Sequence, residues 1–254
     1  MKANKIALVT GGGRGLGKDM VLSIAKKGID IVLTYNSNQK AAEDVAAEVR
    51  SLGQKATVLK LDVSAVSTFD SFVTELKKYL KSDFNTDKID FLVNNGGYGI
   101  SSPSFAETTE DQFDQLMNVH FKGVFFLTQK LLPLLNDGGG IVNISSGLTR
   151  VSFAGRGAYA SMKAAIETLT RYLAKELGSR NIRVNVVAPG AIATDFGGGN
   201  TRDNPQVQTY LKSITAIPRI GQADDIGGIV AFLCSEDAKW MTAQRIEASG
   251  GMSI

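Results

Sequence analysis

Short runs of mostly apolar, branched residues recur along this chain and alternate with longer amphipathic stretches. Strands that are covered on both faces have this pattern, because neither face meets water. The six runs are residues 6–9, 31–33, 56–59, 91–93, 141–144 and 184–187. Residues 41–49 and 164–177, which lie between runs, carry apolar side chains at three- and four-residue spacing and are predicted to be helices. The alternation predicts an α/β fold with a doubly wound parallel sheet and helices on both faces.

Length and composition indicate one domain. The chain has 254 residues, of which 43% are hydrophobic, and no linker or repeat divides it, so residues 1–254 are predicted to fold as a single domain. Cys234 is the only cysteine and cannot form an internal disulfide. His120 is the only histidine, so we expect no metal site. We interpret His120 as a structural residue, with a minor role in a functional site left open.

Charge and hydropathy argue against nucleic-acid and membrane partners. The formal net charge is only +3, and lysines are interspersed with acidic residues, so no basic stripe forms. No stretch is long and apolar enough to cross a bilayer, and no signal-peptide core follows the N-terminus. We therefore expect a cytoplasmic protein.

A glycine-rich segment follows the first predicted strand and leads into a predicted helix. Glycine lets the backbone turn sharply and approach a pyrophosphate, whose charge is favoured by the free N–H groups at a helix start. The spacing Gly-x-x-x-Gly-x-Gly differs from the usual fingerprint, and its position at the carboxyl end of a strand carries the argument against a plain tight turn. The predicted dinucleotide contacts here are Gly11, Gly13, Arg14, Gly15, Leu16 and Gly17.

The end of the second predicted strand bears on which dinucleotide is bound. An acidic residue there would bind the ribose hydroxyls of NAD and repel the 2′-phosphate of NADP, and none is present. Arg14 can supply positive charge, and Asn36 and Ser37 can donate hydrogen bonds to a phosphate. We expect NADP(H) rather than NAD(H), the alternative being that Arg14 is a solvated loop residue.

One tyrosine of the six has a lysine four residues later, Tyr159 with Lys163. On a helix these two side chains share a face. A phenol has an ordinary pKa of about 10, and a nearby cation favours its ionised form, so we expect Lys163 to fit Tyr159 for acid–base catalysis. Ser146 follows a predicted strand and could hydrogen-bond a carbonyl oxygen.

These motifs together resemble those of the short-chain dehydrogenase/reductase family, in its classical single-domain type. The resemblance covers nearly the whole chain and is carried by Thr10-Gly11-x-x-x-Gly15-x-Gly17, Asn94-Asn95-Gly96-Gly97, Ser146, Tyr159-x-x-x-Lys163 and Pro189-Gly190. It implies a Rossmann-like sheet of about seven strands and hydride transfer at the nicotinamide. Tyr159 would protonate the carbonyl oxygen of a ketone while Ser146 holds that oxygen.

The same resemblance assigns further residues. Lys163 would also bond the nicotinamide ribose, and Asn118 would hold a water that relays protons to Lys163, unless it is only a helix surface residue. Asp62 would contact the adenine, unless it is only a helix cap. The remaining implied cofactor contacts are Val63, Asn94, Gly96, Tyr159, Pro189, Gly190, Ile192 and Thr194.

Two departures from the family pattern are visible. Gly96 stands where alanine is usual, which adds backbone freedom to the cofactor wall. Residues 247–251 replace a frequent apolar-Asp-Gly-Gly pattern in a region where family members pack as tetramers. A homotetramer is implied nonetheless.

Substrate choice is expected to depend on a lid at about residues 191–218. The lid and the apolar residues of 98–100, Leu148, Val151 and Phe153 favour an uncharged ketone. The chain is similar to 3-oxoacyl-carrier-protein reductases, with Arg180 at a docking position but Asn136 and Asp137 where a basic residue is frequent. A 3-oxoacyl-thioester reductase is therefore an alternative, and a non-catalytic NADPH sensor or scaffold is another.

Overall fold

Seven parallel strands form one sheet in the order β3-β2-β1-β4-β5-β6-β7. The computed structural model describes residues 4–100, 102 and 104–254 of the chain. All six predicted strands are confirmed. The strands are β1 (Ile6–Val9), β2 (Asp30–Tyr35), β3 (Ala56–Lys60), β4 (Ile89–Asn94), β5 (Leu135–Ile144), β6 (Arg183–Pro189) and β7 (Arg245–Ala248). The order reverses between β1 and β4, which is where ligands bind in sheets of this kind.

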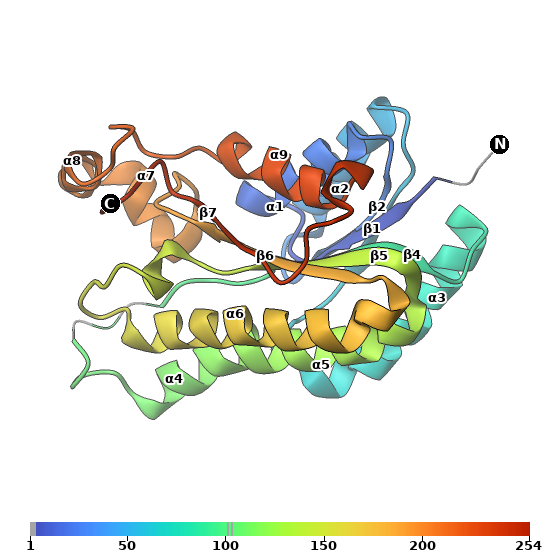
Figure 1. Cartoon of the computed structure of the whole chain (residues 1–254), viewed down its shortest axis with the longest axis horizontal. Coiled ribbons are helices and arrows are strands. Elements are labelled where there is room, and N and C mark those ends of the chain that lie inside the picture. Colours follow the sequence, from blue (N-terminus) through green and yellow to red (C-terminus); the bar gives the residue numbers. More distant parts are fainter. Residues whose placement is uncertain (1–3, 101, 103) are drawn as a thin grey trace.

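Helices cover both faces of the sheet (Figure 1). One face carries α1 (Gly15–Ala25), α2 (Gln39–Ser51) and α9 (Asp224–Leu233). The other carries α3 (Phe69–Phe84), α4 (Glu110–Met117), α5 (Gly123–Leu131) and α6 (Gly157–Leu177). Each layer of helices encloses its own buried apolar cluster against the sheet. The two short helices α7 (Asn200–Asp203) and α8 (Pro205–Ser213) lie beyond the carboxyl ends of the strands.

Two local features differ from the sequence pattern. The triple glycine at residues 138–140, which reads as a turn, lies inside β5 at a shift in the register with β4. Gly138 has a φ of +78° there, a conformation that glycine adopts without strain. The glycines at 197–199, where the sequence predicts a mobile loop, form a tight turn in which all three have positive φ.

The helical segment between β4 and β5 contains one wider turn. Residues Asn118–Lys122 form a π-helical turn that joins α4 to α5 without a break. Such turns insert an extra residue, shift the side chains that follow, and occur frequently at functional sites. In the described part of the chain, no helix is long and apolar enough to cross a membrane.

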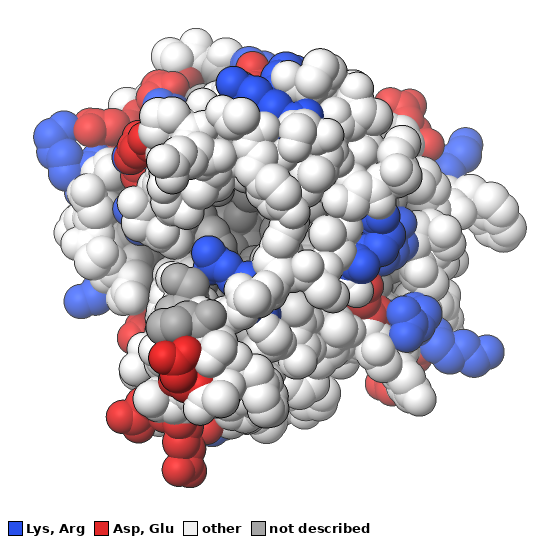
Figure 2. Space-filling view, turned by 90° about the vertical axis from the view of Figure 1, so that its left-hand side faces the viewer, with Lys and Arg blue, Asp and Glu red and all other residues white. Residues whose placement is uncertain are grey.

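The carboxyl ends of the strands open onto a hollowed face. Figure 2 shows this face, with mostly uncharged residues around the hollow and basic atoms at part of its rim. The predicted glycine loop, Ser146 and the segment after β6 all follow strands that end at this edge. The sheet therefore brings the predicted site residues to one side of the molecule.

Candidate active site

The glycine loop turns tightly between β1 and α1. Gly11 and Gly15 have φ values of +66° and +53°, and a Cβ at Gly17 would lie 2.1 Å from the carbonyl oxygen of Gly11. Gly13 lies against the start of α2, where an added Cβ would be 3.3 Å from Ala42, and the Leu16 side chain packs on the neighbouring apolar cluster. Arg14 gives α1 no side-chain cap, which leaves the first N–H groups of this helix free to meet an anion.

A second loop, after β4, is hydrogen-bonded to the glycine loop. The Thr10 hydroxyl accepts from the backbone N–H groups of Asn95 and Gly96, at 3.0 and 2.9 Å. The Asn95 amide donates in turn to the carbonyl oxygens of Thr10 and Gly11. The predicted site residues included Gly96 but neither Thr10 nor Asn95. Both residues belong to the motifs that carry the family resemblance, and those motifs are the sequence signal that could have identified them.

The Asn94 side chain forms its hydrogen bonds in the interior of the protein. Its amide donates to the Thr128 hydroxyl and to the side-chain oxygen of Asn143, at 3.1 and 2.8 Å, and Asn143 donates to Thr170. These bonds tie β4 and β5 to the helices beneath them. A contact between Asn94 and a ribose would therefore depend on the Asn94 backbone.

Asp62 and Val63 lie beside the loop after β4. One carboxylate oxygen of Asp62 accepts from both the backbone N–H and the hydroxyl of Ser64, which makes a local turn rather than a helix cap. Val63 borders Gly96, where an added Cβ would be 3.3 Å from Val63. The same Cβ would be 3.3 Å from the Thr10 hydroxyl, so the missing methyl group of Gly96 leaves little empty space.

The structure places the three residues expected to select NADP(H) at the surface. Asn36 and Ser37 are exposed at the end of β2. Arg14 is exposed as well, and its guanidinium lies 3.5 Å from the Asp195 carboxylate in the segment after β6. Asp195 also pairs with Arg202. Arg14 thus links the glycine loop to the predicted lid.

The segment after β6 passes over the glycine loop. The Gly190 N–H donates to the Ala248 carbonyl next to Pro189, and a Cβ at Gly190 would be 2.7 Å from Ser249. Ile192 forms an isolated bridge with Gly221. The Thr194 side chain lies 3.6 Å from the position of a Gly15 Cβ. Residues 189–194, which the family resemblance implies to be a clamp for the nicotinamide, therefore face the predicted pyrophosphate loop.

Tyr159, Ser146 and Lys163 come together at the ends of β5 and α6. Ser146 accepts a hydrogen bond from the Leu148 N–H, and its side chain lies close enough to the buried Tyr159 phenol to favour the ionised form of that phenol. The Lys163 ammonium donates to the Ile144 carbonyl at 2.8 Å and lies 5.7 Å from the centre of the Tyr159 ring. The hydroxyl of the serine and the phenol of the tyrosine can thus both reach one oxygen atom of a substrate.

Electrostatics at Tyr159 differ from the sequence expectation. Burial raises the pKa of the phenol to about 12, and the hydrogen bond with Ser146 and the charge of Arg156 lower it by less. Burial also lowers the pKa of Lys163 to about 8. We expected Lys163 to lower the pKa of Tyr159. The pKa is raised instead, because desolvation of the phenol outweighs the effect of the nearby charges.

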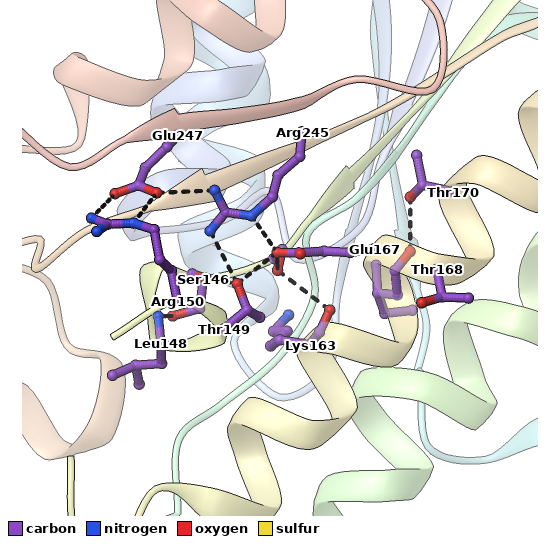
Figure 3. A network of polar contacts seen from close by, with 12 residues as sticks. Ser146, Leu148, Thr149, Arg150, Lys163, Glu167, Thr168, Thr170, Arg245 and Glu247 are labelled. Atoms are coloured by element: carbon purple, nitrogen blue, oxygen red, sulfur yellow. Dashed lines mark hydrogen bonds and ion pairs between the residues drawn. The ribbon is translucent and has the colours of Figure 1, made fainter. Parts of the chain in front are cut away.

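A network of charged side chains supports the serine turn, which comprises residues 146–149 (Figure 3). One Glu167 oxygen accepts from the hydroxyls of Ser145 and Thr149 and from the Arg245 guanidinium, all within 2.8 Å. Glu247 accepts from Arg150 and Arg245, and these partners lower its pKa to about 2. The network connects β5, α6 and β7 just behind Ser146. None of these four charged residues was among the predicted site residues.

The π-helical turn presents His120 to Tyr159. Asn118 is half-buried at the start of the turn, and its backbone carbonyl accepts from Gly123. The buried His120 ring meets the Tyr159 ring edge-on, with centroids 5.0 Å apart. Burial, reinforced by the charge of Lys163, lowers the pKa of His120 to about 3.

Apolar side chains surround the site as expected. Ile100 and Leu148 pack with Tyr159, while Val151 and Phe153 pack with Leu211 of α8. Phe196 was not singled out by the sequence; its ring lies 5.7 Å from that of Tyr159 and closes over it from the segment after β6. The described residues contain no group of three or more acidic, histidine or cysteine side chains that could hold a metal.

The fold and this set of residues define an oxidoreductase that acts on C=O and CH–OH groups. A family model described as "Enoyl-(Acyl carrier protein) reductase" matches residues 11–253. A protein of Picea abies named "Short-chain type dehydrogenase/reductase" is 36% identical over 97% of this chain and 92% of its own length. The chain belongs to the short-chain dehydrogenase/reductase family.

Solved structures of ketoreductases have the same fold. The reductase LugOII, described as promiscuous and as acting on C1 in lugdunomycin biosynthesis, superposes with a TM-score of 0.93 at 33% identity, covering 99% of both chains. The angucycline C-6 ketoreductase LanV, solved with bound NADP, gives a TM-score of 0.92 at 34% identity, covering 98% of this chain and 95% of its own. The chain is thus similar to ketoreductases, one of which was solved with bound NADP.

Proposed function

We propose that the protein reduces an uncharged ketone to a secondary alcohol, reversibly, with NADP(H). The observation that carries the proposal is the placement of the buried Tyr159 phenol beside Ser146, with the Lys163 ammonium 5.7 Å from the centre of the Tyr159 ring. The bound dinucleotide supplies the hydride. Ser146 holds the carbonyl oxygen, Tyr159 donates a proton to it, and Lys163 replaces that proton through a water held at Asn118.

The cofactor would lie along the carboxyl edge of the sheet. Its pyrophosphate fits the free N–H groups at the start of α1, and its nicotinamide fits between the loop after β4 and residues 189–194. The absence of an acidic residue at the end of β2, together with exposed Arg14, Asn36 and Ser37, favours NADP(H) over NAD(H). The NADP bound to LanV supports the same choice.

The walls of the site favour a small apolar ketone. Residues 191–218 form the lid in this proposal, and Phe196 already lies against Tyr159. The 3-oxoacyl-thioester alternative has less support, because Arg180 is engaged by Asp137 and by two backbone carbonyls instead of standing free for an acidic carrier. The proposal includes a cytoplasmic homotetramer.

The proposal is tested by mixing purified protein with NADPH or NADH and a panel of alkyl ketones, aryl ketones and acyl thioesters. We expect loss of reduced nicotinamide absorbance with NADPH and a ketone, and at least a 100-fold loss of that rate in Tyr159→Phe. Tyr172→Phe is the control, because Tyr172 is exposed on the same helix. Cofactor binding without turnover of any compound would favour the sensor, and turnover of thioesters alone would favour the alternative enzyme.

A further inference from the structure

The single histidine occupies a position that the proposed chemistry does not use. His120 is only 1% exposed and lies in the middle of the π-helical turn. Its ring is held between the loop after β4 and the first turn of α6. The titratable groups that face it are Tyr98 from the loop and Tyr159 and Lys163 from α6.

Two contacts join the histidine to these two segments. Its Nε2 atom lies 2.6 Å from the carbonyl oxygen of Tyr98, and its ring meets Tyr159 at an interplanar angle of 87°. Gly97 makes the close approach possible, since a Cβ there would be 2.6 Å from Cε1 of His120. The loop backbone and the tyrosine ring are therefore fixed relative to each other through one imidazole.

The hydrogen bond determines the protonation of the ring. A carbonyl oxygen can only accept, so Nε2 carries the hydrogen and Nδ1 carries a lone pair. Burial and the charge of Lys163 oppose a second proton, in keeping with a pKa of about 3. The buried Nδ1 atom has no partner among the described residues. A side chain present only for packing would be better replaced by an apolar one, because an unpaired buried acceptor is unfavourable.

We propose that His120 is a positioning residue. Its imidazole fixes the orientation of the Tyr159 ring by the edge-on contact, and its Nε2 atom anchors the loop after β4 at the carbonyl oxygen of Tyr98. The proposal rests on the proposed role of Tyr159 as the proton donor. Its two contacts are made by different parts of the side chain. Variants can therefore separate them.

His120→Gln keeps a donor near the position of Nε2 but removes the ring edge. We expect its melting temperature and its Kd for NADPH to stay close to those of the wild type, and its kcat to fall about tenfold because the phenol is misplaced. His120→Phe keeps the ring edge but removes the donor to Tyr98. Here we expect kcat to fall less than in His120→Gln and the KM for the ketone to rise, because the loop loosens.

The order of effects decides the proposal. If both variants keep kcat and KM within twofold of the wild type, His120 is only a core residue and the proposal is wrong. The proposal is also wrong if kcat and KM change by the same factors in both variants, since the two contacts would then have no separate roles. Absence of turnover in the wild type would instead refute the proposed function.

Nitrogen NMR gives a readout that does not depend on turnover. The chain has one histidine, so ¹⁵N-histidine labelling yields the signals of His120 alone. We expect a neutral ring with its hydrogen on Nε2 from pH 8 down to pH 5. Titration near the ordinary pKa of about 6.5, or hydrogen on Nδ1, would overturn the assignment.

Discussion

At the scale of single residues, burial controls the two ionisable groups of the proposed reaction. The Tyr159 phenol has a pKa of about 12 and stays protonated, which suits a proton donor. Lys163 has a pKa of about 8, which leaves its charge sensitive to conditions near neutrality. The lysine therefore limits the pH range of ketone reduction more than the tyrosine does.

The expected pH profile follows from this order. The ammonium of Lys163 is lost as the pH rises through about 8, while Tyr159 keeps its proton, so kcat/KM for ketone reduction should fall above pH 8. Lys163→Met should have a low rate without this decline. Lys175→Met, an exposed change on the same helix, is the control. An unaltered decline in Lys163→Met would assign it to another group.

The proposed preference for NADP(H) also depends on exposed single residues. Arg14 lies near Asp195, which competes with a phosphate for the guanidinium. Arg14→Gln should raise the Kd of NADPH about fivefold and leave the Kd of NADH unchanged, as expected for the loss of one exposed ion pair. Asp195→Asn should strengthen NADPH binding. Equal effects on the Kd values of NADPH and NADH, measured by fluorescence titration, would contradict a role in 2′-phosphate recognition.

At the scale of elements, the sequence predicts the buried strands but predicts neither the charged edge strand β7 nor the π-helical turn. Strands β1 to β6 contain the apolar runs. Strand β7, at one edge of the sheet, alternates Arg245 and Glu247 with apolar residues and lacks this pattern. The π-helical turn has no simple sequence pattern. It places the His120 ring against Tyr159, a contact that the sequence does not predict.

The network between β5, α6 and β7 leads to a prediction about the serine turn. Glu167 is largely buried, and Glu167→Gln leaves Arg245 and the hydroxyls of Ser145 and Thr149 with a weaker acceptor. We expect the free energy of unfolding to fall by about 1–3 kcal/mol in a urea titration. Glu176→Gln, an exposed change on the same helix, should have almost no effect. Equal stability of the two variants would show that the network adds little.

At the scale of the whole molecule, the sheet brings distant segments to one edge. The glycine loop, the serine turn and the clamp are far apart in sequence, and each follows a strand whose carboxyl end opens on the same hollow (Figure 2). This arrangement follows from parallel topology and was therefore predictable from the strand pattern. The side-chain partners of Asn94, Arg14 and His120 depend on packing between elements, which a single sequence does not specify.

One buried group should make the stability of the whole chain depend on pH in a defined range. The unfolded chain protonates His120 below its ordinary pKa of about 6.5, and the folded chain does so only near pH 3. Because the unfolded state then binds more protons, the free energy of unfolding falls as the pH decreases, by about 1.4 kcal/mol per pH unit. Above pH 6.5 this contribution is complete.

The measurement is urea unfolding between pH 7 and pH 5, for the wild type and His120→Gln. Asp225 and Glu247 have pKa values of about 2 in the folded chain, and their contributions change only below about pH 4.5. Other groups are shared by the two proteins and cancel in the difference. We expect the stability of the wild type relative to His120→Gln to fall by about 1–2 kcal/mol from pH 6.5 to pH 5. A constant difference would mean that the histidine has the same pKa in the folded and the unfolded chain.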